Sequence, residues 1–420
     1  MGRMPRFLPG IPRRFVLTSV AIAATCGIGA RPLKGPGPLL AQSPQPITIR
    51  AARMLDGRGA VLTGAVIEVR GSTIAAVDQR RGPVTHDLGD STLLPGLIDV
   101  HVHLNWYFGP GGRYGERDVT AGYAADAILD NARRTLMAGF TTVQSLGAAS
   151  DKPLRDAIAS GVVVGPRLLS SLGQLHPGNQ TPAELRERVR ASKAQGADAI
   201  KAFASGSIRD GGKMNVTQAQ LDAICAEARA QGLRTLIHAH SPESIIAAVK
   251  AGCTQIEHGG SADDAAIAAM KEANVLFDPN IGLVLQNYLE NREKFAGSGN
   301  FNDEGFSFME KAAPTMARIF SRAWQAGVRM PLGTDAVAGA HGQNARELIA
   351  RIRNGGQSPM DAIVSATSLA AESLGLGDTI GTLKPGYEAD IIAVPDDPVA
   401  TPAALRRVTF VMKGGRVYRR

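Results

Sequence analysis

Six residues of types that commonly bind metal ions each stand near the end of a short apolar run. The runs are LLPGLIDVHVHL, GADAIKAFASG, TLIHAHS, TQIEHGG and PLGTDA. The six residues are His101, His103, Lys201, His238, His258 and Asp335. Imidazoles and carboxylates are donors that hold catalytic divalent cations in hydrolases. Because the candidates recur at successive run ends, we predict that they meet at one metal site.

His101 and His103 are two residues apart in an extended run, so both side chains point to the same face of a strand. Val102 then points to the other face, into an apolar layer. Two imidazoles so placed would bind one divalent ion at about 2.0–2.1 Å if that ion is zinc. Such a pair alone is more often structural, but the apolar sequence before it and the other candidates favour a metal site.

The middle of the chain alternates between helical patterns and short apolar runs. Helical periodicity is followed by runs such as TTVQSL, DAIKAFA and VLFDPN, and most helical segments end in glycine. With LIDVHVHL, VVVGPRLLSS and VRMPLGTD, the pattern predicts eight parallel strands. We therefore expect an α/β protein with a (β/α)8 TIM-like barrel, whose strand ends carry the catalytic residues. Residues 282–306 break the alternation and are predicted to form a loop over the site.

Short strands and turns flank this region on both sides. AVIEVRGSTIAAVD contains two apolar runs around a Gly-Ser turn, which predicts a hairpin. EADIIAVP and VTFVMKGGRVY have the same texture near the C-terminus. We predict one small β-sandwich formed by residues 42–92 and 379–420, around a barrel of residues 93–378.

Residues 1–41 have the features of an export signal that is removed from the mature protein. IPRRFVLTSVAIAATCGIGA joins a basic start to a short apolar run and small residues. The apolar run is shorter than the roughly 20 residues that span a bilayer, so no stable membrane anchor is expected. Arg13 and Arg14 favour the twin-arginine route, with an ordinary secretory signal as the alternative. We expect a periplasmic or extracellular protein, cleaved near Ala30 or Ala41.

The net charge of +8 comes mostly from this leader, which holds six Arg or Lys and no acidic residue. The rest of the chain has 40 basic and 38 acidic residues, and it contains no basic run with interleaved aromatic residues. The sequence therefore excludes nucleic acid as a partner.

Beyond the leader the chain has two cysteines, Cys225 and Cys253. We expect two buried free thiols, with a disulfide as the alternative in an oxidising compartment. Their spacing does not fit a cysteine-ligated zinc site. No Gly-x-Ser-x-Gly elbow is present, so a serine nucleophile is not supported.

Two stretches carry a family resemblance, namely LLPGLIDVHVHL and SPMDAIVSATSLAAESLGLGDTIGTLKPGYEADIIAV. Together with the candidate ligands they resemble the amidohydrolase superfamily, in its prolidase-like and imidazolonepropionase-like branch, over residues 46–418. Lys201 favours the binuclear dipeptidase-like members, in which a lysine here reacts with CO2 and the resulting carbamate bridges two metal ions. The alternatives for Lys201 are a surface lysine or one paired with Asp198.

The resemblance implies two divalent metal ions and a role for each ligand. Zinc is the expected metal, and manganese or iron would accept the same donors. His238 and His258 would hold the second metal, while Asp335 would bind the first and transfer the proton during catalysis. His240 would contact the substrate and stabilise the oxyanion; the alternative is a residue that orients another ligand.

The same resemblance implies hydrolysis of the amide bond of a dipeptide or N-acyl amino acid, ochratoxin-like amides included. Prolidase-like members often have tyrosine in place of His240, so the histidine favours the ochratoxin-cleaving side. A lactonase or cyclic-amide hydrolase on the same centre is the alternative. We expect a homo-oligomer that acts on a small molecule. Substrate contacts are predicted at His240, His341, Arg113, Tyr114 and His176.

Overall fold

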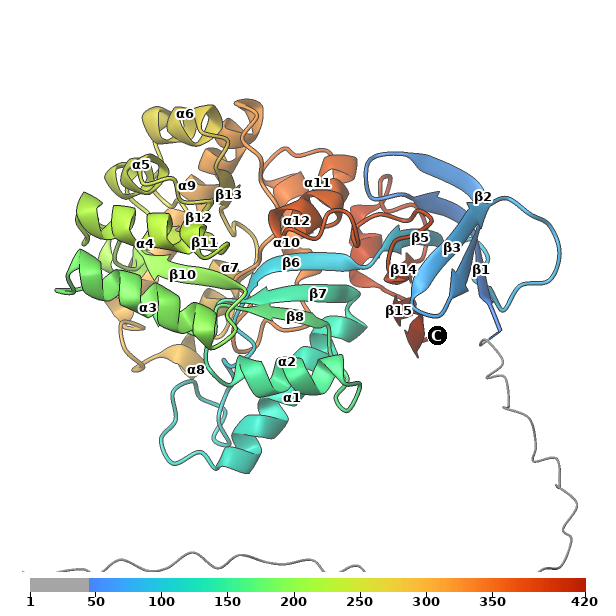
Figure 1. Ribbon diagram of the computed structural model, residues 1–420, viewed down its shortest axis with the longest axis horizontal. Helices are drawn as coiled ribbons and strands as arrows, with labels where there is room; N and C mark the ends of the chain where they lie inside the picture. Colours follow the sequence, from blue (N-terminus) through green and yellow to red (C-terminus); the bar gives the residue numbers. More distant parts are fainter. Residues whose placement is uncertain (1–44) are drawn as a thin grey trace, which may run out of the picture. The chain divides into compact units, whose positions relative to one another are not determined.

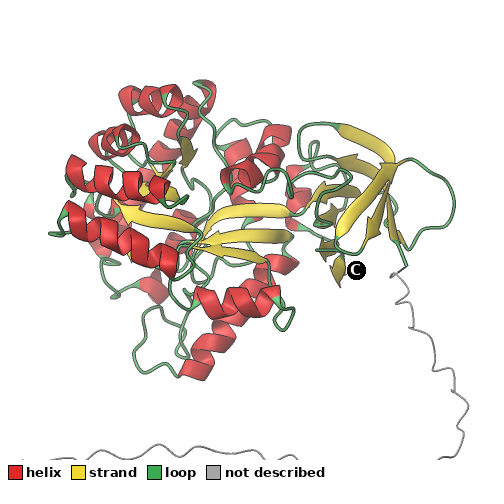
Figure 2. Ribbon diagram, in the orientation of Figure 1, coloured by secondary structure: helices red, strands yellow, loops and turns green. Residues whose placement is uncertain are grey.

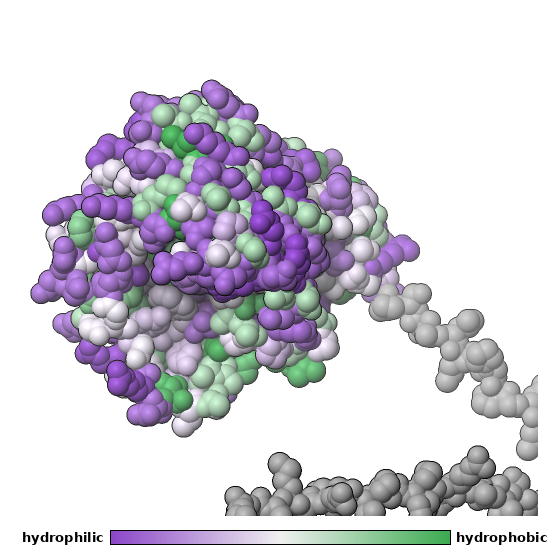
Figure 3. Space-filling view, turned by 60° about the vertical axis from the view of Figure 1, so that its left-hand side comes forward, coloured by the Kyte–Doolittle hydropathy of each residue, from purple (hydrophilic) through white to green (hydrophobic). Residues whose placement is uncertain are grey.

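The computed structural model describes residues 45–420. The predicted export signal lies outside the described residues. Within residues 45–420, no helix combines the length and the apolar character that crossing a bilayer requires. The face drawn in Figure 3 is largely hydrophilic, with apolar side chains dispersed over it.

Strands from both ends of the chain pair in one sheet. Its order is β16-β15-β14-β5-β1-β2-β3, with β4 paired to β1 (Figure 1). The N-terminal strands are β1 (Ile47–Leu55), β2 (Val61–Arg70), β3 (Thr73–Asp78), β4 (His86–Asp87) and β5 (Thr92–Pro95). The C-terminal strands are β14 (Ile391–Val394), β15 (Phe410–Lys413) and β16 (Arg416–Arg419). The predicted hairpin is the antiparallel pair β2–β3, and the antiparallel pair β5–β14 joins the two ends.

Two parallel sheets carry the middle of the chain. The three-stranded sheet contains β6 (Leu97–Val102), β7 (Phe140–Ser145) and β8 (Arg167–Ser170). The five-stranded sheet contains β9 (Gln174–Leu175), β10 (Ala199–Phe203), β11 (Arg234–Ala239), β12 (Gln255–His258) and β13 (Leu276–Asp278). Every pairing within these two sheets is parallel. The α/β class and the parallel strands are therefore confirmed.

The eighth predicted strand, in the run VRMPLGTD, is not a regular strand. Pro331 lacks a backbone N–H, and Asp335 has a positive φ of 51°, so a continuous ladder cannot form. The segment still bonds to both neighbours: the backbone N–H of Phe277 donates to Arg329, and that of Val100 donates to Leu332. These hydrogen bonds connect the 328–336 segment to β13 on one side and to β6 on the other.

Helices surround the strands of the two parallel sheets (Figure 2). In the first half they are α1 (Ala121–Met137), α2 (Asp151–Ala159), α3 (Pro182–Ala194), the 3-10 helix η1 (Ile208–Asp210), α4 (Gln218–Ala230), α5 (Pro242–Lys250) and α6 (Asp264–Glu272). In the second half they are α7 (Val284–Glu290), α8 (Arg292–Phe295), α9 (Asp303–Gln325), α10 (Ala345–Arg353), α11 (Pro359–Ser365), α12 (Ser368–Ser373) and the 3-10 helix η2 (Pro402–Arg406). Thr181 and Thr217 each begin a helix with a complete capping box, which satisfies free backbone N–H groups.

The prediction of a loop over residues 282–306 is wrong in its secondary structure. This segment contains α7, α8 and the beginning of α9. Apolar residues stabilise the two short helices, because Tyr288 and Phe295 are buried and their rings lie 4.9 Å apart. Phe301 packs on both rings. Short helices of this kind depend on tertiary packing, which local sequence patterns do not report.

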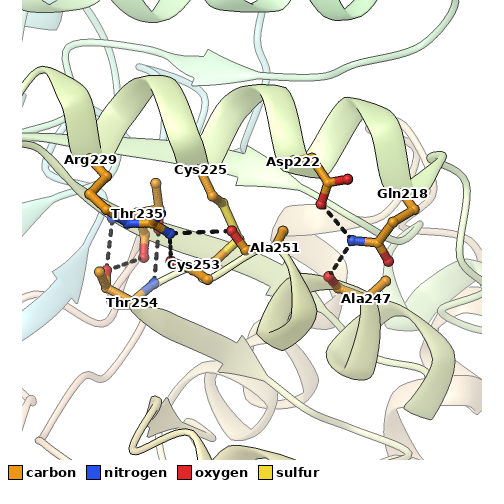
Figure 4. The surroundings of a disulfide bond; sticks show 10 residues. Gln218, Asp222, Cys225, Arg229, Thr235, Ala247, Ala251, Cys253 and Thr254 are labelled. Atoms are coloured by element: carbon orange, nitrogen blue, oxygen red, sulfur yellow. Dashed lines mark hydrogen bonds between the residues drawn. A yellow bond between two sulfur atoms is a disulfide. The ribbon is translucent and has the colours of Figure 1, made fainter.

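Cys225 and Cys253 form a disulfide, so the expectation of two free thiols is wrong. Figure 4 shows Cys225 on α4 and Cys253 in the segment before β12. Both residues are buried, as expected for thiols in a core. Their pairing depends on how α4 packs beside the end of α5, where the two Cα atoms are 5.2 Å apart. Gln218 strengthens the same contact by donating to the Ala247 carbonyl at 3.0 Å.

Candidate functional site

One cavity of about 170 Å³ opens where β6, β10, β11 and β12 end. All six predicted metal ligands line it, although they come from widely separated parts of the sequence. The polar and charged lining residues are His101, His103, Gln174, Lys201, Ser207, Arg209, His238, His240, His258 and Asp335. The apolar and aromatic lining residues are Trp106, Phe203, Ile208, Val284, Leu285, Tyr288 and Met316. The structure therefore brings the predicted ligands together in one place.

His101, His103 and Asp335 form the first group of ligand atoms. The Oδ1 atom of Asp335 lies 3.0 Å from Nε2 of His103 and 3.4 Å from Nε2 of His101. These atoms are close enough together to share one cation. Backbone bonds hold the arrangement, because the N–H of Asp335 donates to the His101 carbonyl at 2.7 Å. The left-handed backbone of Asp335 is a form of strain that often accompanies functional residues.

His238 on β11, His240 just after β11 and His258 at the end of β12 form a second group. The ring centroids of His238 and His258 are 4.7 Å apart, and those of His240 and His258 are 5.2 Å apart. Burial lowers the pKa of all three rings, which keeps them neutral near pH 7. Neutral imidazole is the form that binds metal ions. His258 also has a positive φ of 72°, at the point where β12 ends.

Lys201, at the middle of β10, lines the same cavity. Its side chain is buried, and its Nζ atom has no hydrogen-bond partner among residues 45–420. Burial lowers its pKa, because the charged ammonium is poorly solvated there. The two alternative interpretations of Lys201 are wrong: it is not on the surface, and Asp198 instead pairs with Arg155 at 2.6 Å.

His240 is held in one tautomer by the backbone. Its Nδ1 atom accepts a hydrogen bond from the N–H of Gly260 at 3.2 Å, so this nitrogen carries no proton in the neutral ring. The proton is then on Nε2, which makes that atom a donor. Burial, followed by the charge of Arg209, lowers the pKa of His240 to about 3. This geometry provides a fixed neutral hydrogen-bond donor in the cavity wall.

Sequence reasoning missed two buried carboxylates beneath His101. Glu257 on β12 accepts from Nδ1 of His101 at 2.6 Å, and Asp278 at the end of β13 has an oxygen 3.4 Å from the same nitrogen. Burial and the charge of Lys201 act to lower the pKa of His101. The negative charges of Glu257 and Asp335 outweigh them and raise the pKa of His101 to about 9. An available signal was that each acid interrupts an apolar strand, in TQIEH and VLFD, where a charge needs a partner.

Four of the predicted substrate contacts do not line the cavity. His341 is buried, and burial together with His103 lowers its pKa to about 3. His176 is exposed, and its ring stacks on Phe203 at 4.1 Å between centroids. Arg113 is exposed and donates to the Ala296 carbonyl. Tyr114 packs on the lining residue Trp106 at 4.7 Å. His240 is thus the one predicted substrate contact that reaches the cavity.

The residues present fit a divalent cation, because ligand atoms of His101, His103 and Asp335 lie close enough together to share one. The donor set combines four imidazoles, one carboxylate and a buried amine, and all of them line one cavity. Nδ1 of His103 and Nζ of Lys201 are buried without a hydrogen-bond partner among residues 45–420. Unpartnered buried polar atoms are costly unless something binds them. A cluster of this kind is able to bind cations and polarise a carbonyl group.

Comparison with known proteins agrees with this geometry. The model of the amidohydrolase family matches residues 92–418. Ochratoxinase of Aspergillus niger is 29% identical, over 88% of this chain and 86% of its own length. Imidazolonepropionase of Anaeromyxobacter dehalogenans is 25% identical, over 85% of this chain and 91% of its own length. A crystal structure of a Xaa-Pro dipeptidase with bound methionine superimposes with a TM-score of 0.81 at 28% identity, covering 89% of this chain and 100% of that one.

The family match extends over most of the described residues, and the similar proteins cover 85% or more of the chain. In addition, all six predicted metal ligands line one cavity. The chain therefore belongs to the amidohydrolase family, in its prolidase-like branch.

Proposed function

We propose that the protein is a metal-dependent hydrolase that cleaves the amide bond of a dipeptide or N-acyl amino acid, ochratoxin-like amides included. Membership of the amidohydrolase family supports amide-bond hydrolysis. One observation carries the finer proposal: His101, His103, Lys201, His238, His258 and Asp335 line a single cavity. The names of two similar proteins, an ochratoxinase and a Xaa-Pro dipeptidase, point to the same substrate class.

The proposed centre holds two divalent metal ions, with zinc as the expected metal. His101, His103 and Asp335 would hold one ion, and His238 and His258 the other. Lys201 would join them as a carbamate, because a buried neutral amine can react with CO2 and becomes an anion only when it does so. When bound, the ions would supply hydroxide at neutral pH and polarise the scissile carbonyl.

Two side chains are proposed to act on the substrate itself. The carboxylate of Asp335 would take the proton of the attacking hydroxide and pass it to the leaving amine, and its position beside two imidazoles suits that exchange. Nε2 of His240 would donate to the oxygen that becomes negative during attack. A neutral donor fixed by the Gly260 N–H needs no rearrangement for this role.

Finer features of the fold are also proposals. A closed eight-stranded barrel is supported by the hydrogen bonds that the 328–336 segment makes to β13 and β6. A sandwich of the terminal strands remains a prediction, as do the boundaries at residues 93 and 378. Export through a signal in residues 1–41 is supported by the disulfide, because disulfides persist in oxidising compartments. Homo-oligomerisation would be tested by light scattering of the purified protein.

The proposal is tested by metal analysis followed by a substrate screen. The purified protein should contain about two equivalents of divalent metal per chain, and chelation should abolish activity that added zinc restores. Dipeptides and N-acyl amino acids would be compared with lactones and cyclic amides of similar size. Faster turnover of the amide panel supports the proposal. Faster turnover of lactones or cyclic amides would replace it with the alternative hydrolase on the same centre.

A further inference from the structure

One buried serine, Ser205, lies just after β10, the strand that carries Lys201, and has no role in the proposed chemistry so far. Its side chain is 1% exposed. Its Oγ atom accepts a hydrogen bond from the backbone N–H of His240 at 3.0 Å and donates to the Gly206 carbonyl at 3.0 Å. Because both bonds are made, the orientation of the hydroxyl is fixed. Ser205 therefore joins the end of β10 to the residue that follows β11.

The Gly206 carbonyl that Ser205 holds also contacts a proposed metal ligand. Nε2 of His238 lies 3.1 Å from this carbonyl oxygen. Burial lowers the pKa of His238 well below its usual value, so the ring is neutral near pH 7. A carbonyl accepts and cannot donate, so the single proton of the neutral ring is on Nε2. The Nδ1 atom then has the lone pair that can bind a cation.

The orientation of the Gly206 carbonyl depends on few contacts. The N–H of Gly206 donates to the Lys213 carbonyl at 2.9 Å. Among residues 45–420, Ser205 and His238 are the groups that bond to the carbonyl oxygen of Gly206. Glycine has a freer backbone than other residues, so the bond from Ser205 is a substantial constraint on this peptide group. Phe203 stacks on the His238 ring with the centroids 4.6 Å apart, but stacking does not select a tautomer.

The same hydroxyl restrains His240. Ser205 accepts from the backbone N–H of His240, while the ring Nδ1 atom of His240 accepts from the Gly260 N–H at 3.2 Å. His240 is thus held both at its backbone and at its ring. Without the Ser205 acceptor, the buried N–H of His240 would have to find another partner, because an unsatisfied buried donor is costly. One hydroxyl therefore restrains two histidines with different proposed roles.

We propose that Ser205 is a positioning residue for the hydrolytic centre, and that its hydroxyl sets the tautomer of His238 and the backbone position of His240. This inference rests on the proposed function. Groups that hydrogen-bond to metal-binding histidines orient the rings and strengthen metal binding. Ser205 then strengthens cation binding by His238 and His258, and leaves the first group of ligand atoms unaffected.

Calorimetric titration of zinc into the metal-free protein tests this selectivity. Two binding events are expected, and His258→Ala identifies the event of the second group by removing it. Ser205→Ala should weaken that event about 10- to 100-fold, the usual effect of losing the support behind a metal-binding histidine, and should leave the other event unchanged. Ser373→Ala is the matched control, because it removes a buried hydroxyl on α12 that donates to the Ala370 carbonyl at 2.7 Å. This control should titrate as the wild type.

Ser205→Thr and Ser205→Val separate the hydroxyl from the shape of the side chain. The two replacements have nearly the same shape, and threonine alone can keep both hydrogen bonds. Threonine should therefore retain the event of the second group, and valine should weaken it. Valine should also lower kcat with little change in KM, because the proposed donor His240 acts in the transition state. Equal affinities in the two variants would overturn the proposal, and so would a valine effect on both events alike, because the serine would then support packing in general.

Nuclear magnetic resonance of the metal-free protein, with isotope-labelled histidine, separates this inference from the proposed function. His238→Ala assigns the ring signals of His238. The wild type and Ser205→Thr should have the His238 proton on Nε2, and Ser205→Val should have a mixture of tautomers. If the protein neither binds two zinc ions nor hydrolyses amides, the proposed function fails, and the tautomer still supports or refutes the role of Ser205. If Ser205→Val retains amide hydrolysis, both zinc affinities and the His238 tautomer, the function stands and the assignment of Ser205 is overturned.

Discussion

Glu257 accepts a hydrogen bond from Nδ1 of His101 at 2.6 Å, with both side chains almost completely buried. The contact sets the orientation of the imidazole and places the proton on Nδ1, which leaves Nε2 of His101 free to face Asp335. Gln255 donates to the other oxygen of Glu257 at 2.9 Å, so the carboxylate is itself held in place. Glu257 is therefore a positioning residue for the first group of ligands.

Glu257→Gln is expected to weaken metal binding about 10- to 100-fold, because the amide is a poorer acceptor and no longer fixes the His101 ring. Competition with a chromogenic chelator would measure the affinity. Glu272→Gln, at the exposed end of α6, is the matched control and should behave as the wild type. Unchanged affinity in Glu257→Gln would mean that the ring is oriented by other contacts.

Lys201→Ala is expected to lower metal content and remove nearly all amide hydrolysis. The alanine cannot form a carbamate, so the two ions would lose their shared anionic ligand. Elemental analysis and kcat/KM measured on the same preparation would check both effects. Lys193→Ala, on the exposed end of α3, serves as the control. Wild-type turnover in Lys201→Ala would exclude a bridging carbamate.

His240→Ala is expected to retain both metal ions and lower kcat about 100- to 1,000-fold, the usual effect of losing one oxyanion donor. The side chain accepts from the Gly260 backbone through Nδ1, and among residues 45–420 its Nε2 atom makes no hydrogen bond. Metal content and steady-state kinetics would be measured together. If one equivalent of metal is lost instead, the roles of His238 and His240 are exchanged.

Removal of the disulfide in Cys225→Ala/Cys253→Ala is expected to lower the free energy of unfolding by about 2–4 kcal/mol, because the unfolded chain gains entropy when the cross-link is absent. The bond closes a segment with a sequence separation of 28. Urea unfolding with and without a reductant would measure the change. The reductant should destabilise the wild type and leave the double variant unaffected.

Arg351→Leu is expected to destabilise the fold by about 3–5 kcal/mol, because removing one member of a buried charge network leaves the others uncompensated. Arg351 is fully buried and donates to Asp278 at 3.0 Å and to Glu347 at 3.3 Å. Urea midpoints would be compared with those of Arg353→Leu, which alters an exposed arginine on the same helix. Equal midpoints for the two variants would contradict a structural role for the network.

The proposed metal ligands could be predicted because each one marks the end of an apolar run. Parallel strands separated by helices must end at the same edge, so His101, Lys201, His238 and His258 had to lie near one another. The position of Asp335 could be predicted by the same argument. Its segment, residues 328–336, is not a regular strand, but it makes backbone hydrogen bonds to β6 and β13.

The lining residues outside the proposed metal ligands could not be predicted in the same way. Arg209 and Tyr288 lie in a 3-10 helix and a short α-helix, far apart in sequence, and neither belongs to a periodic pattern. Their proximity depends on how α7 and α8 fold back through Phe295 and Phe301. Arg113 and Tyr114 were plausible because they follow β6, but the loop carries Arg113 to the surface and Tyr114 behind Trp106.

The sheet that unites both ends of the chain also constrains the timing of folding during synthesis. Leu93 on β5 pairs with Ala393 on β14. The ribosome therefore adds 300 residues after Leu93 before the partner strand of β5 exists. At a synthesis rate of about 5–20 residues per second, this delay is roughly 15–60 s. Throughout that interval the β5 edge of the nascent sheet has no permanent neighbour. A ribosome-bound chain that lacks its last thirty residues would therefore be especially dependent on chaperones.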